Sequence, residues 1–261
     1  AIIAQHYRVG GDIINAFQWF LKSADHAWTL GDQEEALRAY QQAEKIYKDA
    51  GEDAFKDEDI LNLYFEWSEF AYEASQVEML EETAIKLQYL GGRENNLLFI
   101  GVSQIALAKA FFLRSELDDG LEIIQKAVDN LETTDNQMVL MQAILHRAVF
   151  HWWKLQYEET IASAKRVLEM LQSMDSLSPD LISKKFVARH AIGSVYYAQG
   201  NAKKALENAQ ELYKGDFQQL NPFDRIRTLY FLGYAHALSA HPEKSKHYGV
   251  KALEIADILN N

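Results

Sequence analysis

The chain contains no cysteine and only three prolines among its 261 residues. Without cysteine it can have no disulfide framework, thiolate metal site or cysteine nucleophile, and a reducing compartment is favoured, so we expect a cytoplasmic protein. Each proline lies between predicted helices, directly after Ser178, Asn221 or His241. Proline suits the first turn of a helix, and Ser178 and Asn221 are good N-caps before it. The scarcity of proline therefore leaves long stretches that can be helical.

The chain also lacks a long hydrophobic run. Its most apolar stretch, residues 139–153, is interrupted by Gln142, His146, Arg147 and His151, whereas a membrane span needs about 20 predominantly apolar residues. We therefore expect no membrane-spanning segment. No signal peptide is visible. Because the chain begins at Ala1 without methionine and its first residues already have a helical pattern, we expect a segment of a larger protein.

Motifs of catalysis and cofactor binding are absent too. There is no GxxxxGK[ST] phosphate loop, no GxGxxG, no HExxH and no GxSxG. His236, His241 and His247 would converge on a metal only if the intervening loop folded back, and Ala54 stands where a calcium loop over residues 49–59 would need glycine. We therefore expect no catalytic residue, no cofactor and no metal, and interpret the chain as a protein other than an enzyme.

Positive charge is scarce in the first half of the chain. Residues 1–140 contain 26 Asp and Glu against 11 Lys and Arg, and residues 141–261 contain 12 against 15, giving net charges of −15 and +3. Phosphate binding depends on clustered cations, so we expect no direct contact with nucleic acid or with an anionic membrane. The acidic half favours a basic partner, or it simply keeps a long array soluble. The second half holds a milder basic group, formed by Lys184, Lys185, Arg189, Arg225 and Arg227.

What the sequence does contain is a regular spacing of small residues. Seven times a small residue is followed twelve positions later by a small or modest one, with Leu80 as the large exception. The pairs are Ala4/Ala16, Ala24/Ala36, Ser68/Leu80, Ala108/Gly120, Ala148/Thr160, Gly193/Ala205 and Gly233/Ser245. From the third pair on, the first members are 40, 40, 45 and 40 residues apart, and a period of this size is typical of a stacked repeat array. Small side chains let two antiparallel helices approach where they cross, so we expect each pair to join the helices of one hairpin.

We expect about thirteen helices and no sheet, because no run alternates in the manner of a strand. In the clearest hairpin, Gly193 is the close-contact position, Gly200 ends the first helix in a left-handed conformation, and Ala205 meets Gly193 from the returning helix. Gly31 occupies the same turn position earlier in the chain, and Ser75, Ser115, Leu155 and Ala240 replace the glycine elsewhere. The expected helices cover residues 1–9, 13–30, 33–50, 58–74, 77–90, 95–115, 118–133, 136–154, 158–173, 179–199, 202–213, 222–239 and 243–259.

This pattern resembles the tetratricopeptide repeat (TPR), in which a small residue and an aromatic precede a turn glycine, an alanine, an aromatic and a second alanine. The units around Gly31 and Gly200 match it well, and those around Ser68, Ala108, Ala148 and Gly233 match loosely. The resemblance covers the whole chain and implies an all-α, TPR-like superhelical solenoid of antiparallel helix hairpins, with six or seven repeats in a single domain over residues 1–261. The period near 40 exceeds the roughly 34 residues of the ordinary repeat, which indicates a subtype with longer helices or connections.

The opening stretch is similar to a more specific group, the extended repeats in the C-terminal arms of large bacterial signal-transduction ATPases, which include the activator of the maltose regulon. This similarity implies a sensor or protein-interaction arm of a multidomain signalling or transcriptional regulator, whose ATPase, cyclase, kinase or DNA-binding part lies elsewhere. The alternative is a free-standing scaffold that binds peptides or proteins in its groove. The matching positions are His6, Tyr7, Gly10, Gly11, Asp12, Ala16, Ala36 and Tyr40.

The TPR resemblance also implies a binding surface. In such repeats the first helix of each hairpin lines the concave face, with exposed positions one and four residues after the small contact position. Five of six units then present an aromatic residue at the second position, and we expect this ladder to bind a protein or peptide, or a small effector. The alternative is that the rings pack between neighbouring repeats. The candidate residues are Trp28, Tyr72, Phe112, Trp152 and Tyr197 of the ladder, with Glu69, Lys109, His190, Arg227 and Tyr234 beside it.

Overall fold

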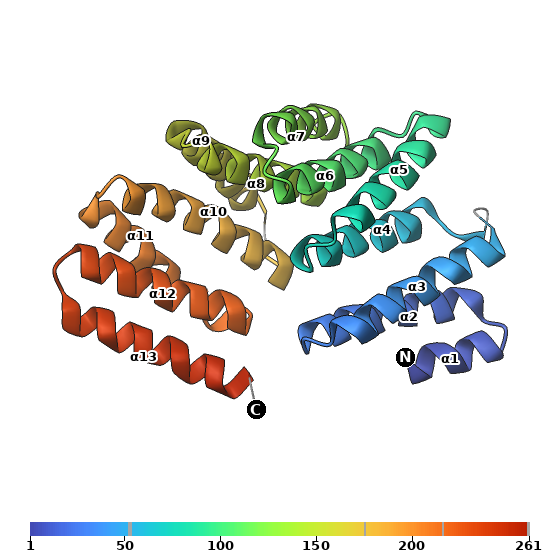
Figure 1. Ribbon diagram of the computed structural model, residues 1–261, viewed down its shortest axis with the longest axis horizontal. Helices are drawn as coiled ribbons and strands as arrows, with labels where there is room; N and C mark the ends of the chain where they lie inside the picture. The colour runs from blue at the N-terminus through green and yellow to red at the C-terminus, as the bar shows by residue number, and fades with distance from the viewer. Residues whose placement is uncertain (52–53, 175, 216, 260–261) are drawn as a thin grey trace. The chain divides into compact units, whose positions relative to one another are not determined.

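A computed structural model describes residues 1–51, 54–174, 176–215 and 217–259. Over these residues the chain forms thirteen α-helices and a short 3-10 helix at Phe217–Gln219, with no strand (Figure 1). The all-α prediction is therefore confirmed. Glu52 and Asp53, in the polar run considered as a calcium loop, lie outside the described residues. None of the helices in the described ranges combines the length and apolarity that crossing a membrane would require.

The chain divides into two compact units, residues 1–123 and 124–261, and each is described by itself. That residues 1–261 form a single repeat domain stays a prediction. Unit 1 contains α1 to α6 and the start of α7, with α1 packed on α2, α2 on α3, α4 on α5, and α5 on α6. Their bounds are α1 (Ile2–Val9), α2 (Ile13–Thr29), α3 (Gln33–Ala50), α4 (Asp57–Glu73), α5 (Val77–Glu94), α6 (Leu97–Leu113) and α7 (Leu117–Leu131).

Unit 2 continues the same pattern of paired helices. α8 packs on α9, α10 on α11, and α12 on α13, while α8 also contacts α10 and α10 contacts α12. We call α2, α4, α6, α8, α10 and α12 the A helices, because they are the first helices of the six hairpins that follow α1. The bounds are α8 (Gln137–Trp153), α9 (Tyr157–Gln172), α10 (Pro179–Ala198), α11 (Ala202–Lys214), α12 (Pro222–Leu238) and α13 (Pro242–Leu259), with the 3-10 helix at Phe217–Gln219.

The helix ends agree with the sequence prediction within two residues, except at the end of α5. The prediction ended this helix at residue 90, before the pair Gly91 and Gly92, but it continues to Glu94. A Cβ added to Gly91 would lie 2.7 Å from Ile100 Cγ1 and 3.1 Å from the Asn96 carbonyl oxygen. Gly91 therefore permits close packing between α5 and the start of α6 and does not end the helix. The helix ends at its C-cap, Asn95, whose backbone has a left-handed conformation.

The residues of the twelve-residue pairs lie in the interior, as predicted. Thirteen of the fourteen are buried, and Ser245 is half-buried. Gly233 shows the expected contact directly, because a Cβ placed on it would lie 3.4 Å from the Ser245 carbonyl oxygen. Leu80, the large exception, is fully buried in a cluster with Ala71 and Ala110. Because Ala71 and Ala110 are small, they leave space for the Leu80 side chain.

The hairpin turns repeat one backbone arrangement. The residue predicted to end the first helix has a φ between +56° and +80° in every hairpin: Gly11, Gly31, Ser75, Ser115, Leu155, Gly200 and Ala240. The next residue donates its amide hydrogen to the carbonyl five positions earlier, as in Asp32 to Ala27 at 2.9 Å and Gln156 to His151 at 2.9 Å. This is the Schellman arrangement, which satisfies carbonyls at the helix end. The sequence prediction of these turns is confirmed even where glycine is absent.

Leu155 is strained at such a turn, because a left-handed backbone costs a side-chain-bearing residue about 1–2 kcal/mol and its φ is +58°. Its side chain is 69% exposed, so little packing would be lost on its removal. We expect Leu155→Gly to raise the free energy of unfolding by roughly 0.5–1 kcal/mol after the entropy cost of glycine, as measured by urea denaturation. Leu30 is the control: it is 71% exposed in the turn between α2 and α3, but its φ of −85° is unstrained. Leu30→Gly should therefore lower the free energy of unfolding. Equal effects of both changes would refute the strain at Leu155.

Candidate functional site

The ten candidate residues divide between the two units. Trp28, Glu69, Tyr72, Lys109 and Phe112 belong to unit 1, on α2, α4 and α6. Trp152, His190, Tyr197, Arg227 and Tyr234 belong to unit 2, on α8, α10 and α12. All ten therefore lie on A helices. Each group is described within its own unit.

In unit 1 the aromatic residues contact neighbouring A helices. The indole nitrogen of Trp28 donates a hydrogen bond to Glu73 Oε2 at 3.0 Å, and its ring meets the ring of Phe70 edge-on at 5.2 Å between centroids. The Tyr72 and Phe112 rings meet at 6.1 Å between centroids and at 61°. Trp28, Tyr72 and Phe112 all remain half-buried. The rings thus connect consecutive repeats and also keep one side open to solvent.

Lys109 and Glu69 form a buried ion pair between α6 and α4. The Lys109 side chain is 1% exposed, and its Nζ lies 2.6 Å from Glu69 Oε1. The ammonium is also 3.4 Å from Ser68 Oγ and 5.7 Å from the centroid of the Tyr72 ring. Burial, together with the charges of Glu69 and Glu73, raises the pKa of the Tyr72 hydroxyl to about 12. Lys109 is thus an interior cation that holds two A helices together, and its carboxylate partner lies nearer the surface.

Carboxylates converge on the A-helix face of unit 1. Burial and then the charges of Glu66, Asp25, Glu69 and Glu73 raise the pKa of the Tyr40 hydroxyl above its usual range. Asp25 lies on α2 and the other three carboxylates lie on α4. These four carboxylates thus act together on the Tyr40 hydroxyl.

In unit 2, His190 is enclosed by aromatic rings. Its ring lies 5.6 Å from Phe186 and 5.5 Å from Phe231, centroid to centroid. Burial and then the positive charge of Arg227 lower the pKa of His190 to about 4. The imidazole is therefore neutral at neutral pH. His190 therefore packs between the Phe186 and Phe231 rings, whereas the nearby Arg227 side chain faces solvent.

The pKa of His190 has a consequence for stability. In the unfolded chain this imidazole takes up a proton near pH 6.5, but in the folded protein only near pH 4. Stability is therefore lost as the pH falls through this window, by about 1 kcal/mol between pH 7.5 and 5.5 for this one group. We expect His190→Phe, which keeps a ring between Phe186 and Phe231, to reduce the pH dependence of the free energy of unfolding by that amount. Urea denaturation at both pH values measures it, and an unchanged pH dependence in His190→Phe would contradict the expectation.

Three exposed tyrosines lie together in unit 2. The Tyr197 ring lies 5.8 Å from the Tyr234 ring, which stacks on Tyr230 at 6.2 Å and 25°. Tyr197 projects from α10, and the other two from α12. Trp152, on α8, is half-buried and contacts Tyr157 at 5.6 Å between centroids. The structure thus brings together Tyr197 and Tyr234, both candidate residues, and adds Tyr230.

The sequence prediction did not include Tyr230, although a signal for it was present. The offset rule considered one and four residues after each small position, which after Gly233 gives Tyr234 and Ala237. On a helix, residues three or four apart share a face. Phe223, Arg227, Tyr230 and Tyr234 follow such a spacing along α12, and a helical-face count of α12 would have found Tyr230.

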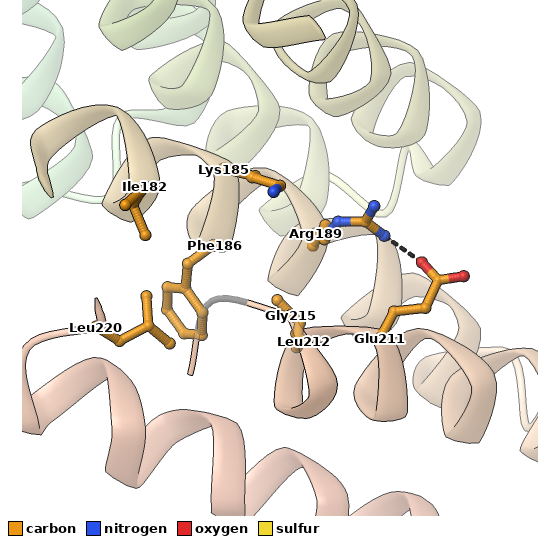
Figure 2. A pocket seen from close by; sticks show the side chains of 8 residues that line it. All are labelled: Ile182, Lys185, Phe186, Arg189, Glu211, Leu212, Gly215 and Leu220. Atoms are coloured by element: carbon orange, nitrogen blue, oxygen red, sulfur yellow. Dashed lines mark hydrogen bonds and ion pairs between the residues drawn. The ribbon is translucent and has the colours of Figure 1, made fainter. Parts of the chain in front are cut away.

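The structure also contains a small cavity between α10, α11 and the segment that precedes α12 (Figure 2). Its volume is about 90 Å³, whereas small-molecule pockets measure about 300–1,000 Å³. Figure 2 shows Phe186, Ile182 and Leu220 on one side and the ion pair of Arg189 with Glu211 on the other. This cavity can take a few water molecules and is too small for a typical small-molecule ligand.

No group of three or more metal-ligating side chains occurs among the residues that the structure describes. His236 and His241 come close, with ring centroids 5.7 Å apart. His236, however, stacks flat on Tyr248 at 5.4 Å, and His247 lies against the same tyrosine at 5.3 Å. His236 and His247 therefore pack against one aromatic ring, and His241 lies against His236.

Comparison with known proteins identifies the fold. No model of a known protein family matches the chain, and no curated protein matches it. Among solved structures, a variant form of the TPR-like repeats of a kinesin light chain-type protein from Podosopora anserina gives a TM-score of 0.57 at 16% identity, over 79% of this chain and 100% of that one. BtubC from P. vanneervenii gives 0.59 at 13% identity, over 95% and 92%. The apo form of RapI gives 0.50 at 12% identity, over 92% and 97%.

At these identities the likeness concerns the fold, and the fold of this chain is a TPR-like solenoid of helix hairpins. The predicted fold class is confirmed. The similarity of the opening residues to the arms of signal-transduction ATPases stays a prediction.

Proposed function

We propose that the chain is a non-catalytic, TPR-like domain that binds protein or peptide segments through the exposed faces of its A helices. The observation that carries this proposal is the group of Tyr197, Tyr230 and Tyr234, which are 42%, 47% and 52% exposed, with the Tyr234 ring next to each of the other two. Aromatic rings dominate the binding energy of many interfaces because they offer large contact area at low entropy cost. Covering these rings would stabilise a complex by about 25 cal/mol for each Å² of apolar surface removed from water.

The A-helix face of unit 1 offers a second surface of different charge. Asp25, Glu66, Glu69 and Glu73 act on the buried Tyr40 hydroxyl there, and Glu69 and Glu73 also act on the half-buried Tyr72. Charge complementarity favours a basic stretch of a partner at this face. Residues 1–123 as a whole contain 23 Asp and Glu against 10 Lys and Arg, which supports the same choice.

In the cell, the domain serves as the sensor or interaction arm of a multidomain cytoplasmic signalling or transcriptional regulator. Supporting this part of the proposal is the similarity of residues 1–45 to the first repeats that follow the ATPase core in bacterial signal-transduction ATPases. The natural reading frame tests it. A frame that extends well upstream of Ala1 and encodes a phosphate-binding loop agrees with the regulator, whereas a frame that begins near Ala1 favours a free-standing scaffold.

Site-specific photo-crosslinking in the source cells tests the binding function. A photoreactive phenylalanine analogue at position 234 should capture a specific protein, because that side chain lies within the proposed surface. The matched control is position 89 on α5, where Tyr89 is 63% exposed outside the A helices. Capture of the same proteins at both positions, or of none at position 234, would contradict the proposal.

A further inference from the structure

One side of α12 forms a continuous exposed stripe. Phe223, Arg227, Tyr230 and Tyr234 follow one another at steps of four, three and four residues, which places them on one side of the helix. At a rise of about 1.5 Å per residue the stripe is about 16 Å long. Tyr197 of α10 extends it sideways through its contact with Tyr234. We call these five residues the Tyr–Arg face (Figure 1 shows α10 and α12).

Arg227 is the exposed cation of this face. Its side chain is 64% exposed, and within the described residues its one polar contact is Nη1 to Asp224 Oδ1 at 3.4 Å. Asp224 already accepts hydrogen bonds from Ser183 Oγ at 3.1 Å and from Asn221 Nδ2 at 2.9 Å. A guanidinium has five N–H donors arranged for a planar, two-oxygen acceptor. Most of this capacity on Arg227 therefore faces solvent.

The surrounding A helices have few carboxylates that could compete for Arg227. Across α8, α10 and α12 the acidic residues are Asp180 and Asp224, and Asp224 is buried. The same three helices carry six cations: Arg147, Lys184, Lys185, Arg189, Arg225 and Arg227. By contrast, α4 of unit 1 has six carboxylates and no Lys or Arg. The A helices of unit 2 thus favour a negatively charged occupant, and α4 disfavours one.

We propose that the Tyr–Arg face binds an acidic segment of a partner protein. A carboxylate of that segment pairs with Arg227, in the two-oxygen geometry that makes arginine–carboxylate pairs strong. An apolar or aromatic side chain of the same segment covers Tyr230, Tyr234 and Tyr197. This inference rests on the proposed protein-binding function and adds the chemical class of the partner and the residues that select it.

Selection of peptides from a random 12-residue phage library on the folded 261-residue chain tests the inference. We expect the selected peptides to be enriched in Asp or Glu together with Leu, Phe, Trp or Tyr. Synthetic copies, measured by fluorescence anisotropy, should bind Arg227→Gln and Tyr234→Ser at least tenfold more weakly than the original chain. Both side chains are exposed, so circular dichroism melting should show the two variants folded. Lys203→Gln, which removes an exposed cation from α11, is the matched control and should bind as the original chain does.

Three results would overturn the inference. In the first, the selected peptides are basic, or they bind Arg227→Gln as tightly as the original chain. The chain would then still bind peptides, but not acidic ones through Arg227. A labelled single-stranded oligonucleotide that binds as tightly as the selected peptides, and loses affinity in Arg227→Gln, would show that the face takes phosphate. Failure to select any peptide would contradict the proposed binding function as well, which distinguishes it from the first two results.

Discussion

Gly193→Ala is expected to lower the free energy of unfolding by about 3 kcal/mol, at the upper end of the usual cost of overpacking. A Cβ at this position would lie 2.2 Å from Phe231 Cζ, 2.3 Å from Phe231 Cε1 and 2.9 Å from Asn208 Oδ1. The Phe231 ring is buried and packs against His190, so it has little room to move. Alanine has the better helix propensity by about 1 kcal/mol, which offsets only part of the clash.

Gly233 supplies a matched control. It lies 40 residues after Gly193 in the same repeat position, and it is buried on the A helix α12. Its added Cβ would meet Ser245 O at 3.4 Å, which is close to ordinary van der Waals contact. We expect Gly233→Ala to change stability by less than about 1 kcal/mol, with the gain in helix propensity offsetting the tight contact. Urea denaturation of both variants gives the comparison, and equal losses would show that Gly193 is not a special close approach.

Lys109→Met is expected to lower the free energy of unfolding by about 3 kcal/mol. Methionine keeps much of the side-chain volume but removes the ammonium that pairs with Glu69 at 2.6 Å. Breaking a buried ion pair by removing one partner typically costs about 3–5 kcal/mol, because the other charge is left without compensation. The Glu69 side chain is 26% exposed, so water relieves part of this cost and the effect lies at the lower end.

Two further variants separate the charge effect from packing. Lys109→Met combined with Glu69→Gln removes the uncompensated carboxylate, so the double variant should recover part of the lost stability. Arg38→Met removes a cation whose side chain is 59% exposed and pairs with Glu34 and Glu35 on the surface of α3, and it should cost less than about 1 kcal/mol. If the double variant is as unstable as Lys109→Met, the loss comes from packing and the ion pair has no special role.

The sequence predicted the repeat architecture well because that architecture depends on local rules. Helix ends follow caps and turns: Asp32 caps α3 through its side chain, and Gly31 before it is left-handed. The same rules located Ser75, Ser115, Leu155 and Ala240 at equivalent turns, since the backbone of the hairpin forces the conformation there even without glycine. The twelve-residue pairs also lie inside as predicted, because close helix crossings admit only limited side-chain volume.

The candidate site was less predictable, because exposure depends on neighbours from other repeats. A fixed offset placed Lys109 and His190 on the A-helix face, but Glu69 of α4 covers the first with an ion pair and Phe231 of α12 covers the second with its ring. The offsets of one and four residues missed Tyr230, which lies four residues before Tyr234 on the exposed side of α12. Local pattern thus indicated candidate helices, and tertiary contacts decided which of their side chains reach solvent.

The affinity of the partner captured at position 234 tests the central claim most directly. Isothermal titration calorimetry compares the original chain with a variant in which Tyr197, Tyr230 and Tyr234 are serine, and with Tyr89→Ser as the matched exposed control. Binding through the A-helix face of unit 2 predicts at least a tenfold loss for the triple variant, together with unchanged melting, and no loss for Tyr89→Ser. Equal affinity of the triple variant and the original chain would contradict binding at this face.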